Sequence, residues 1–100
     1  MAKRRKILDR WKFPHLQHHG VTLVARKDAN ACVARIFADS CRFYGYDAFT
    51  LFPDKKIQPH LDWSPSWSGG TTPSQQAIMA ELELHPPEVT HYEFVFEDDI

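Results

Sequence analysis

The sequence predicts one small α+β domain, and three features lead to that prediction. The chain has 100 residues, which is the length of one ordinary domain. Hydrophobic residues make up 43% of it, which is enough for one packed core and too many for a disordered chain. Segments with helical spacing of hydrophobic residues are interspersed with short β-branched or alternating segments. We therefore expect residues 1–100 to fold as a single mixed domain.

The first segments predict a short helix, a turn and a strand. Residues 3–12 favour a helix, because their hydrophobic residues recur on one side. Pro14 and Gly20 then bracket a histidine-rich turn. Residues 21–26 are short and rich in β-branched side chains, which indicates a strand.

A longer helix is expected to begin at Asp28, whose carboxylate can accept an orphan backbone N–H as an N-cap. Hydrophobic and small residues follow with helical spacing as far as Tyr44, and Gly45 is a suitable end. On such a helix Cys32 and Cys41 would lie on opposite sides. We therefore expect no disulfide between them.

The second half predicts a hairpin, a helix and a final strand. Residues 47–52 and 57–63 favour two strands, with turn residues between them. The next helix has a capping box formed by Thr72 and Gln75. Residues 89–96 alternate between hydrophobic and polar, which is typical of a half-buried strand.

The resulting order is βαββαβ behind an extra N-terminal helix. This order fits a ferredoxin-like two-layer sandwich, in which two helices cover one face of a four-stranded sheet. Residues 1–12 would form a basic N-terminal helix or arm, and residues 97–100 would form an acidic tail.

The charges are distributed unevenly along the chain. Residues 1–42 contain ten Lys or Arg and three Asp or Glu, whereas residues 43–100 contain two Lys and ten Asp or Glu. An acidic surface can compete for a basic surface on another protein. The alternative is that the two halves pack together and their charges cancel.

No hydrophobic run approaches the roughly 18 residues that a membrane helix needs. Asp9, Arg10 and Lys12 interrupt the segment in which a signal peptide would continue. We therefore expect a cytoplasmic protein without a membrane partner.

The sequence has no recognisable catalytic or cofactor motif. His15 with His19, or His60 with Asp62, could supply two metal ligands, whereas a zinc site needs three or four. We expect no catalytic residue, no metal site and no cofactor. The alternative is a small metal-dependent hydrolase that uses some of His15, His19, His60, Asp62, His85 and His91.

Two tryptophans lie in a loop rich in Ser, Pro and Gly. Exposed tryptophan is enriched at interface hot spots, although either ring could also fold back over the core. Together with the acidic C-terminal half, this loop predicts a binding surface for a protein partner. The expected contact residues are Trp63, Trp67, Glu93, Glu97, Asp98 and Asp99.

The basic N-terminal segment offers a second interpretation. Positive charge beside an aromatic ring suits a nucleic-acid backbone with base stacking. The residues concerned are Lys3, Arg4, Arg5, Lys6, Arg10, Trp11 and Lys12.

Of these readings, the leading hypothesis is a non-catalytic protein-binding module that acts as an inhibitor or accessory factor on a partner with a basic surface. In size and layout the chain resembles the small inhibitor proteins that phages make against host defence systems, although no motif is shared.

Overall fold

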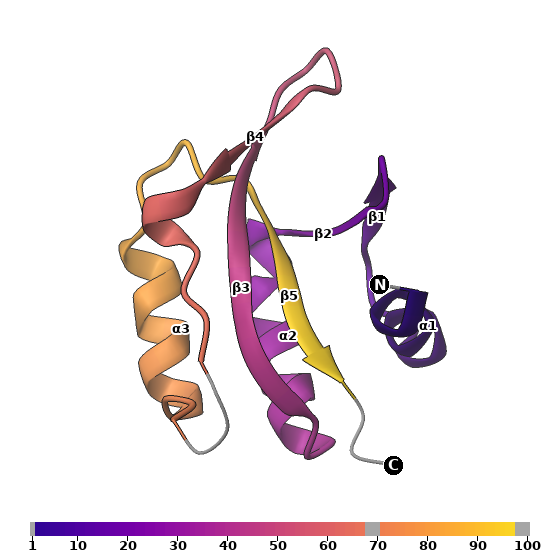
Figure 1. The fold of residues 1–100 in the computed structure, drawn as a ribbon, viewed down its shortest axis with the longest axis vertical. Coiled ribbons are helices and arrows are strands. Elements are labelled where there is room, and N and C mark those ends of the chain that lie inside the picture. The colour runs from indigo at the N-terminus through magenta and orange to yellow at the C-terminus, as the bar shows by residue number, and fades with distance from the viewer. Residues whose placement is uncertain (1, 68–70, 98–100) are drawn as a thin grey trace.

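A computed structural model of the protein describes the backbone of residues 2–67 and 71–97, and the side chains from residue 7 onward (Figure 1). Its helices are α1 (Ala2–Trp11), α2 (Arg26–Ala38), α3 (Gln75–Leu84) and the short 3₁₀ helix η1 (Leu61–Trp63). Its strands are β1 (Leu16–His18), β2 (Val21–Ala25), β3 (Arg42–Leu51), β4 (Ile57–His60) and β5 (His91–Glu97). None of the described helices is long and hydrophobic enough to cross a bilayer.

The strands form one antiparallel sheet in the order β1-β2-β5-β3-β4, and the fold is therefore mixed α+β as expected. The predicted ferredoxin-like order is not confirmed. In that order the first strand of the βαββαβ unit lies between the last and the third, whereas here the last strand, β5, lies between β2 and β3. The β3–β5 pairing is long and runs from Arg42 opposite Glu97 to Phe49 opposite His91. Pro59 lies in the edge strand β4, where its missing N–H is tolerated.

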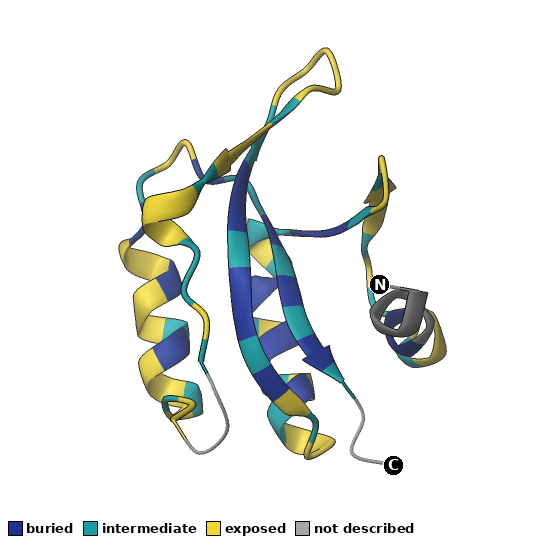
Figure 2. Cartoon of the chain, in the orientation of Figure 1, coloured by how far each residue is buried: buried dark blue, intermediate teal, exposed yellow. Residues whose placement is uncertain are grey.

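The core lies between the sheet and the helices α2 and α3, and Figure 2 shows buried positions alternating along β5. In the paired strands, Tyr46 lies opposite Phe94 and Ala48 lies opposite Tyr92, so all four side chains face the helices. Helices α1, α2 and α3 contribute the buried residues Ile7, Leu8, Cys32, Val33, Ile36, Ile78 and Leu82. Burial of these side chains is the main force that holds the two layers together.

An irregularity in β3 explains why its alternation was hidden in the sequence. The register shifts between Phe43 and Gly45, so that Phe43 and Tyr46 both face the core. Gly45 has φ +150°, and a Cβ there would meet the backbone of residues 65–66, with Ser66 Cα at 2.9 Å and Pro65 O closer still. Ser66 forms an antiparallel β-bridge with Gly45 of β3. Gly45 is therefore needed for close approach inside a strand and does not end a helix.

The expected helix from Asp28 to Tyr44 was wrong at both ends. Ala25 is the N-cap, without a side-chain cap bond, and Asp28 lies in the first turn. The helix ends at Ala38, because Ser40 adopts φ 56° and its N–H and that of Cys41 donate to Phe37 O and Ile36 O. This is a Schellman motif with serine in the position that glycine usually occupies. Neither cysteine forms a disulfide with the other, and Cys41 lies beyond the helix.

Two smaller expectations also need correction. The capping box at Thr72 is not formed, because Ser74 is the N-cap of α3 and accepts the N–H of Ala77 at 3.1 Å. Thr72 instead donates its hydroxyl to Phe43 O on β3. The histidine-rich segment was expected to be a turn, but it contains the strand β1, which pairs with β2.

Candidate functional site

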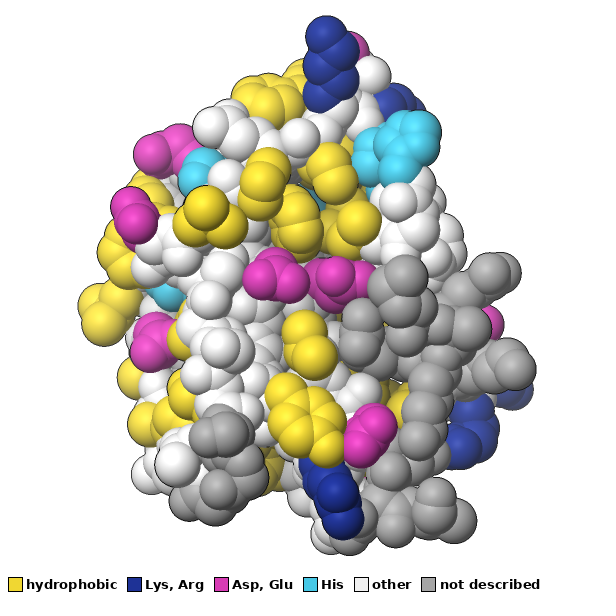
Figure 3. Space-filling model, in the orientation of Figure 1, with side chains coloured by type: hydrophobic (Ala, Val, Ile, Leu, Met, Phe, Trp, Pro, Cys, Tyr) yellow, Lys and Arg dark blue, Asp and Glu magenta, His cyan; other side chains and the backbone are white. Residues whose placement is uncertain are grey.

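Exposed hydrophobic side chains gather where η1 lies against α3. Leu61 is 83% exposed, Leu84 is 81% exposed and Trp63 is 39% exposed. The carboxylates of Asp62 and Glu81 are also exposed there. We call Leu61, Asp62, Trp63, Glu81 and Leu84 the α3–η1 surface. Figure 3 shows acidic and hydrophobic side chains side by side along the left of the molecule, where α3 lies.

A pocket of about 260 Å³ opens in this surface. Residues 61–65 line one side of it, and Glu81 and His85 line the other. Glu81 lies in the last turns of α3, and His85, four residues later, is the C-cap of the helix. Both residues face the pocket because residues four positions apart lie on the same side of a helix. Leu84, three residues after Glu81, lies beside it on the helix surface. The rings of Trp63 and His85 are 5.0 Å apart with planes inclined by 49°.

A buried chain of hydrogen bonds lies under the pocket. Tyr46 donates its hydroxyl to Glu81 Oε1, and the Tyr46 oxygen lies 3.4 Å from His85 Nε2. On the other side of the ring, His85 Nδ1 lies 2.8 Å from the Tyr92 hydroxyl. Since Tyr46 gives its only proton to the carboxylate, it can bond to His85 only as an acceptor. The Tyr92 hydroxyl also lies 3.5 Å from Leu82 O, to which it can donate.

The environment favours the uncharged forms of His85, Tyr46 and Tyr92. Burial lowers the pKa of His85, and Arg26 lowers it further, whereas Glu81 acts in the opposite direction. Burial also raises the pKa of Tyr92 to about 12. Burial and the hydrogen bond to Glu81 raise the pKa of Tyr46 well above its ordinary value. A neutral imidazole lies between two protonated tyrosines, and Glu81 is held in position by the Tyr46 hydroxyl.

The Arg26 side chain donates hydrogen bonds to the backbone at the C-terminal end of α3. Its Nη1 donates to Pro86 O at 2.6 Å and to Val89 O at 3.0 Å, and its Nη2 donates to His85 O at 2.6 Å and to Leu82 O at 3.3 Å. Helix C-termini carry orphan carbonyls and partial negative charge, both of which a guanidinium satisfies. Arg26 thereby ties α2 to α3 and to the loop that enters β5.

The acidic side chains of this surface have no counterion in the described part of the chain. Neither Asp62 nor Glu81 forms an ion pair among the residues that the structure describes. The sequence explains this, because it contains no Lys or Arg after Lys56. Arg26 lies nearby, but its donors are directed at backbone carbonyls.

The two predicted tryptophans occupy different environments. Trp63 lies on η1 at the pocket, partly exposed. Trp67 is partly buried, and its ring packs edge-on against Phe43 at 5.3 Å and Tyr46 at 6.1 Å. The backbone N–H of Trp67 donates to Tyr44 O at 2.6 Å. Trp67 therefore covers the core, and Trp63 remains available to a partner.

Of the predicted acidic contacts, Glu93 and Glu97 do not lie on the same surface as Trp63. Glu93 and Glu97 lie on the face of β5 turned away from α2 and α3. Glu93 Oε2 accepts the N–H of Thr22 at 3.0 Å, and Glu97 Oε1 accepts the hydroxyl of Tyr44 at 2.8 Å. The other two predicted contacts, Asp98 and Asp99, lie outside the described residues.

The basic segment forms α1, as expected, and Arg10 and Lys12 are exposed at its end. The side chains of Lys3, Arg4, Arg5 and Lys6 lie outside the described part. Trp11 stacks on Phe96 with ring centres 5.8 Å apart, and the Arg35 guanidinium lies 4.8 Å from its ring centre. Its faces are thus occupied within the fold, which leaves the nucleic-acid interpretation without its expected stacking platform.

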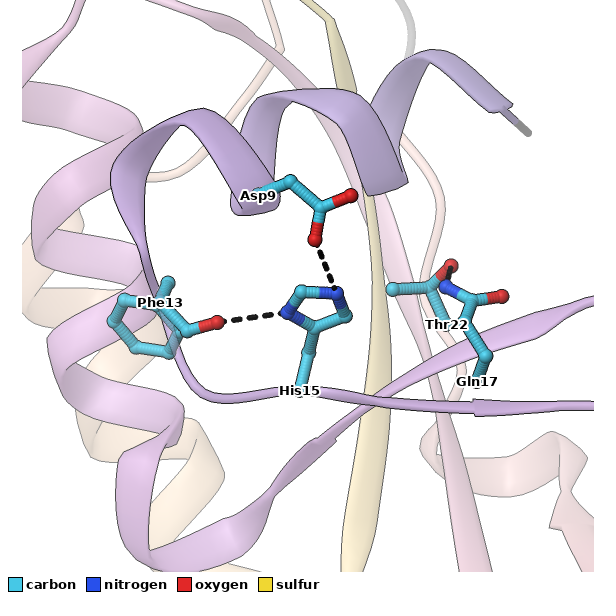
Figure 4. Close-up of polar contacts among 5 residues, drawn as sticks. All are labelled: Asp9, Phe13, His15, Gln17 and Thr22. Atoms are coloured by element: carbon cyan, nitrogen blue, oxygen red, sulfur yellow. Dashed lines mark hydrogen bonds and ion pairs between the residues drawn. The ribbon is translucent and has the colours of Figure 1, made fainter.

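The histidines are dispersed and bonded separately. His15 lies between Asp9 of α1 and the backbone of Phe13, with Nε2 3.1 Å from Asp9 Oδ1 and Nδ1 2.7 Å from Phe13 O (Figure 4). His15 and His19 do not share a helical turn, because β1 lies between them. His60 bonds to Thr50, and Asp62 lies beyond the strand in η1. In the described ranges no group of three His, Cys, Asp or Glu side chains could hold a metal ion.

Several residues of the site were not found by sequence reasoning. The set comprises Arg26, Tyr46, Leu61, Glu81 and Leu84, and His85 was named only as a candidate metal ligand. The one usable signal was the spacing of Glu81 and His85, which puts two polar side chains on one side of the predicted helix. The tyrosine partners come from distant strands and left no local pattern. Comparison with known protein families, with curated proteins and with solved structures found no match.

Proposed function

We propose that this chain is a non-catalytic protein-binding module that docks a basic, partly hydrophobic partner on the α3–η1 surface. The observation that carries the proposal is the exposure of Leu61 and Leu84, at 83% and 81%, beside carboxylates that lack counterions among the described residues. Covering a leucine side chain is worth about 1.5–3 kcal/mol, so a partner that covers both gains substantially. In this role the protein would act as an inhibitor or accessory factor by occupying the basic surface of its partner.

The buried network supports binding over catalysis. His85 has both ring nitrogens engaged by tyrosines, and burial raises the pKa of both tyrosines. A general base or nucleophile needs an accessible group that titrates near neutral pH. The network instead fixes one carboxylate at the rim of the pocket, which suits recognition.

The test compares two matched double variants as bait in lysate of the source cells. Leu61→Gln with Leu84→Gln removes the hydrophobic part of the α3–η1 surface. Leu16→Gln with Phe52→Gln removes two side chains that are each 40% exposed elsewhere. We expect a partner that the unaltered protein and the control variant retain and that the first variant loses.

The retained partner is then purified and its Kd is measured against all three proteins. The first variant should bind at least about tenfold more weakly, a change of about 1.4 kcal/mol, and binding should weaken with salt. Equal binding by all three folded proteins, or a partner lost equally from both variants, would overturn the proposal. Urea unfolding of each variant establishes that the comparison is between folded proteins.

A further inference from the structure

We propose that the pocket between η1 and α3 receives the guanidinium group of an arginine side chain from the partner. The inference rests on the proposed function, because it names the chemistry by which the partner is recognised. It assigns one occupant to one cavity, and three features of the cavity favour that occupant: an aromatic wall, two carboxylates and a suitable size.

The aromatic wall is the indole of Trp63. Trp63 is 39% exposed, and the centre of its ring lies 5.0 Å from that of the His85 ring. Trp63 projects from a short helix that the Ser64 side chain anchors, since Ser64 donates its hydroxyl to His60 O at 2.8 Å and accepts the N–H of Ala48 at 3.1 Å. The indole is the best aromatic partner for a cation, and the planar guanidinium stacks on it.

The carboxylates come from opposite walls of the pocket. Asp62 lies on η1 and Glu81 lies on α3. One oxygen of Glu81 accepts the Tyr46 hydroxyl, and the other has no partner in the part of the chain that the structure describes. The fixed carboxylate therefore offers an acceptor whose position is set by the core. A guanidinium has five N–H donors in a plane and can bond to two carboxylates at once, which a single ammonium does less well.

The charge and size of the pocket favour a single cationic side chain as its occupant. Its walls carry two formal negative charges, and burial lowers the pKa of His85, so the imidazole is neutral near pH 7. The nearby Arg26 cation is held by four carbonyls at the end of α3, whose dipoles offset its charge. The volume of about 260 Å³ lies below the roughly 300–1,000 Å³ of small-molecule sites and suits one long side chain.

The experiment uses the full chain, labelled for NMR, and three capped peptides that differ at one position. That position holds arginine, lysine or citrulline, the last being a neutral analogue with nearly the shape of arginine. We expect the arginine peptide to shift the indole N–H of Trp63 and the amides of residues 61–65, Glu81 and His85. The lysine peptide should bind more weakly, and the citrulline peptide should leave these resonances unchanged.

Variants then identify the carboxylates. Asp62→Asn and Glu81→Gln keep the side-chain shapes, and each should weaken binding of the arginine peptide about threefold to fivefold. Glu83→Gln is the matched control, because it removes the same charge from an exposed position of α3 that does not line the pocket. It should change the affinity by less than about twofold.

The outcomes separate the inference from the function on which it rests. Equal shifts from the citrulline peptide, or equal weakening by Glu83→Gln, would overturn the cation pocket. Equal affinity for lysine and arginine would overturn the assignment to guanidinium. If the peptide fails while the Leu61 and Leu84 variant still loses its partner, the docking surface stands and only the pocket proposal falls.

Discussion

Replacing Arg26 by methionine removes the group that holds the end of α3 while keeping a side chain of similar length. The Arg26 guanidinium donates four hydrogen bonds to carbonyls of residues 82–89, two of them at 2.6 Å. Methionine cannot donate, so the carbonyls at the end of α3 lose their partners. We expect this change to loosen the C-terminal turn of α3 and the loop that leads to β5.

The magnitude follows from the two short bonds. A hydrogen bond that involves a charged group contributes about 1.5–3 kcal/mol, so two of them set an effect of about 3–6 kcal/mol. A domain of this size has about 5–15 kcal/mol of stability in total. A loss of about 3 kcal/mol would lower Tm by at least about 12 °C.

The assay is urea unfolding monitored by tryptophan fluorescence, with Lys27→Met as control. Lys27 is the next residue on α2 and is exposed, so its change should stay within about 0.5 kcal/mol. Arg26→Lys should lie between the two, because one ammonium cannot reach all four carbonyls. If Arg26→Met unfolds at the same urea concentration as Lys27→Met, the guanidinium does not hold α3 and the reasoning is refuted.

Three further changes test other parts of the fold by the same assay. Gly45→Ala should destabilise by on the order of 3 kcal/mol, because its Cβ would meet the backbone of residues 65–66, whereas Gly20→Ala, with open space around it, should cost less. Trp11→Ala should cost about 2 kcal/mol through loss of the stack on Phe96, and a cost below about 0.5 kcal/mol would contradict that packing. The free energy of unfolding should fall as the pH drops below about 6.5, because burial lowers the pKa of His85 and the unfolded chain therefore takes up the proton first. His85→Gln should reduce the slope of the free energy of unfolding against pH, and an unchanged slope would show that His85 is not the group responsible.

The parts of the fold that sequence reasoning predicted correctly are those with a local cause. The alternation of residues 89–96 predicted β5, and the β-branched run after Gly20 predicted β2. The spacing of hydrophobic residues predicted α1 and the middle of α2. Each of these patterns indicates which side of one element is buried, and in the structure that side does face the core.

The errors arise where a distant segment decides the local conformation. Ser40 takes the conformation that glycine usually supplies, so the end of α2 carried no glycine signal. Gly45 resembled a helix end, but it lies in a strand, and the backbone of Pro65 and Ser66 comes so close that no side chain fits there. The strand order depends on the long pairing of β3 with β5, which no short-range pattern encodes.

The proposed binding site shows the same division between local and distant causes. Trp63 was predicted because an exposed tryptophan in a polar loop is a local feature. Glu81 became significant only when Tyr46 and His85 reached it from the core. Ordering a free side chain at an interface costs about 0.5–1.5 kcal/mol, and here that ordering is completed during folding. Under the proposed function, the buried network would contribute to recognition without touching a partner, because it holds the Glu81 carboxylate in one orientation at the pocket that Trp63 also lines.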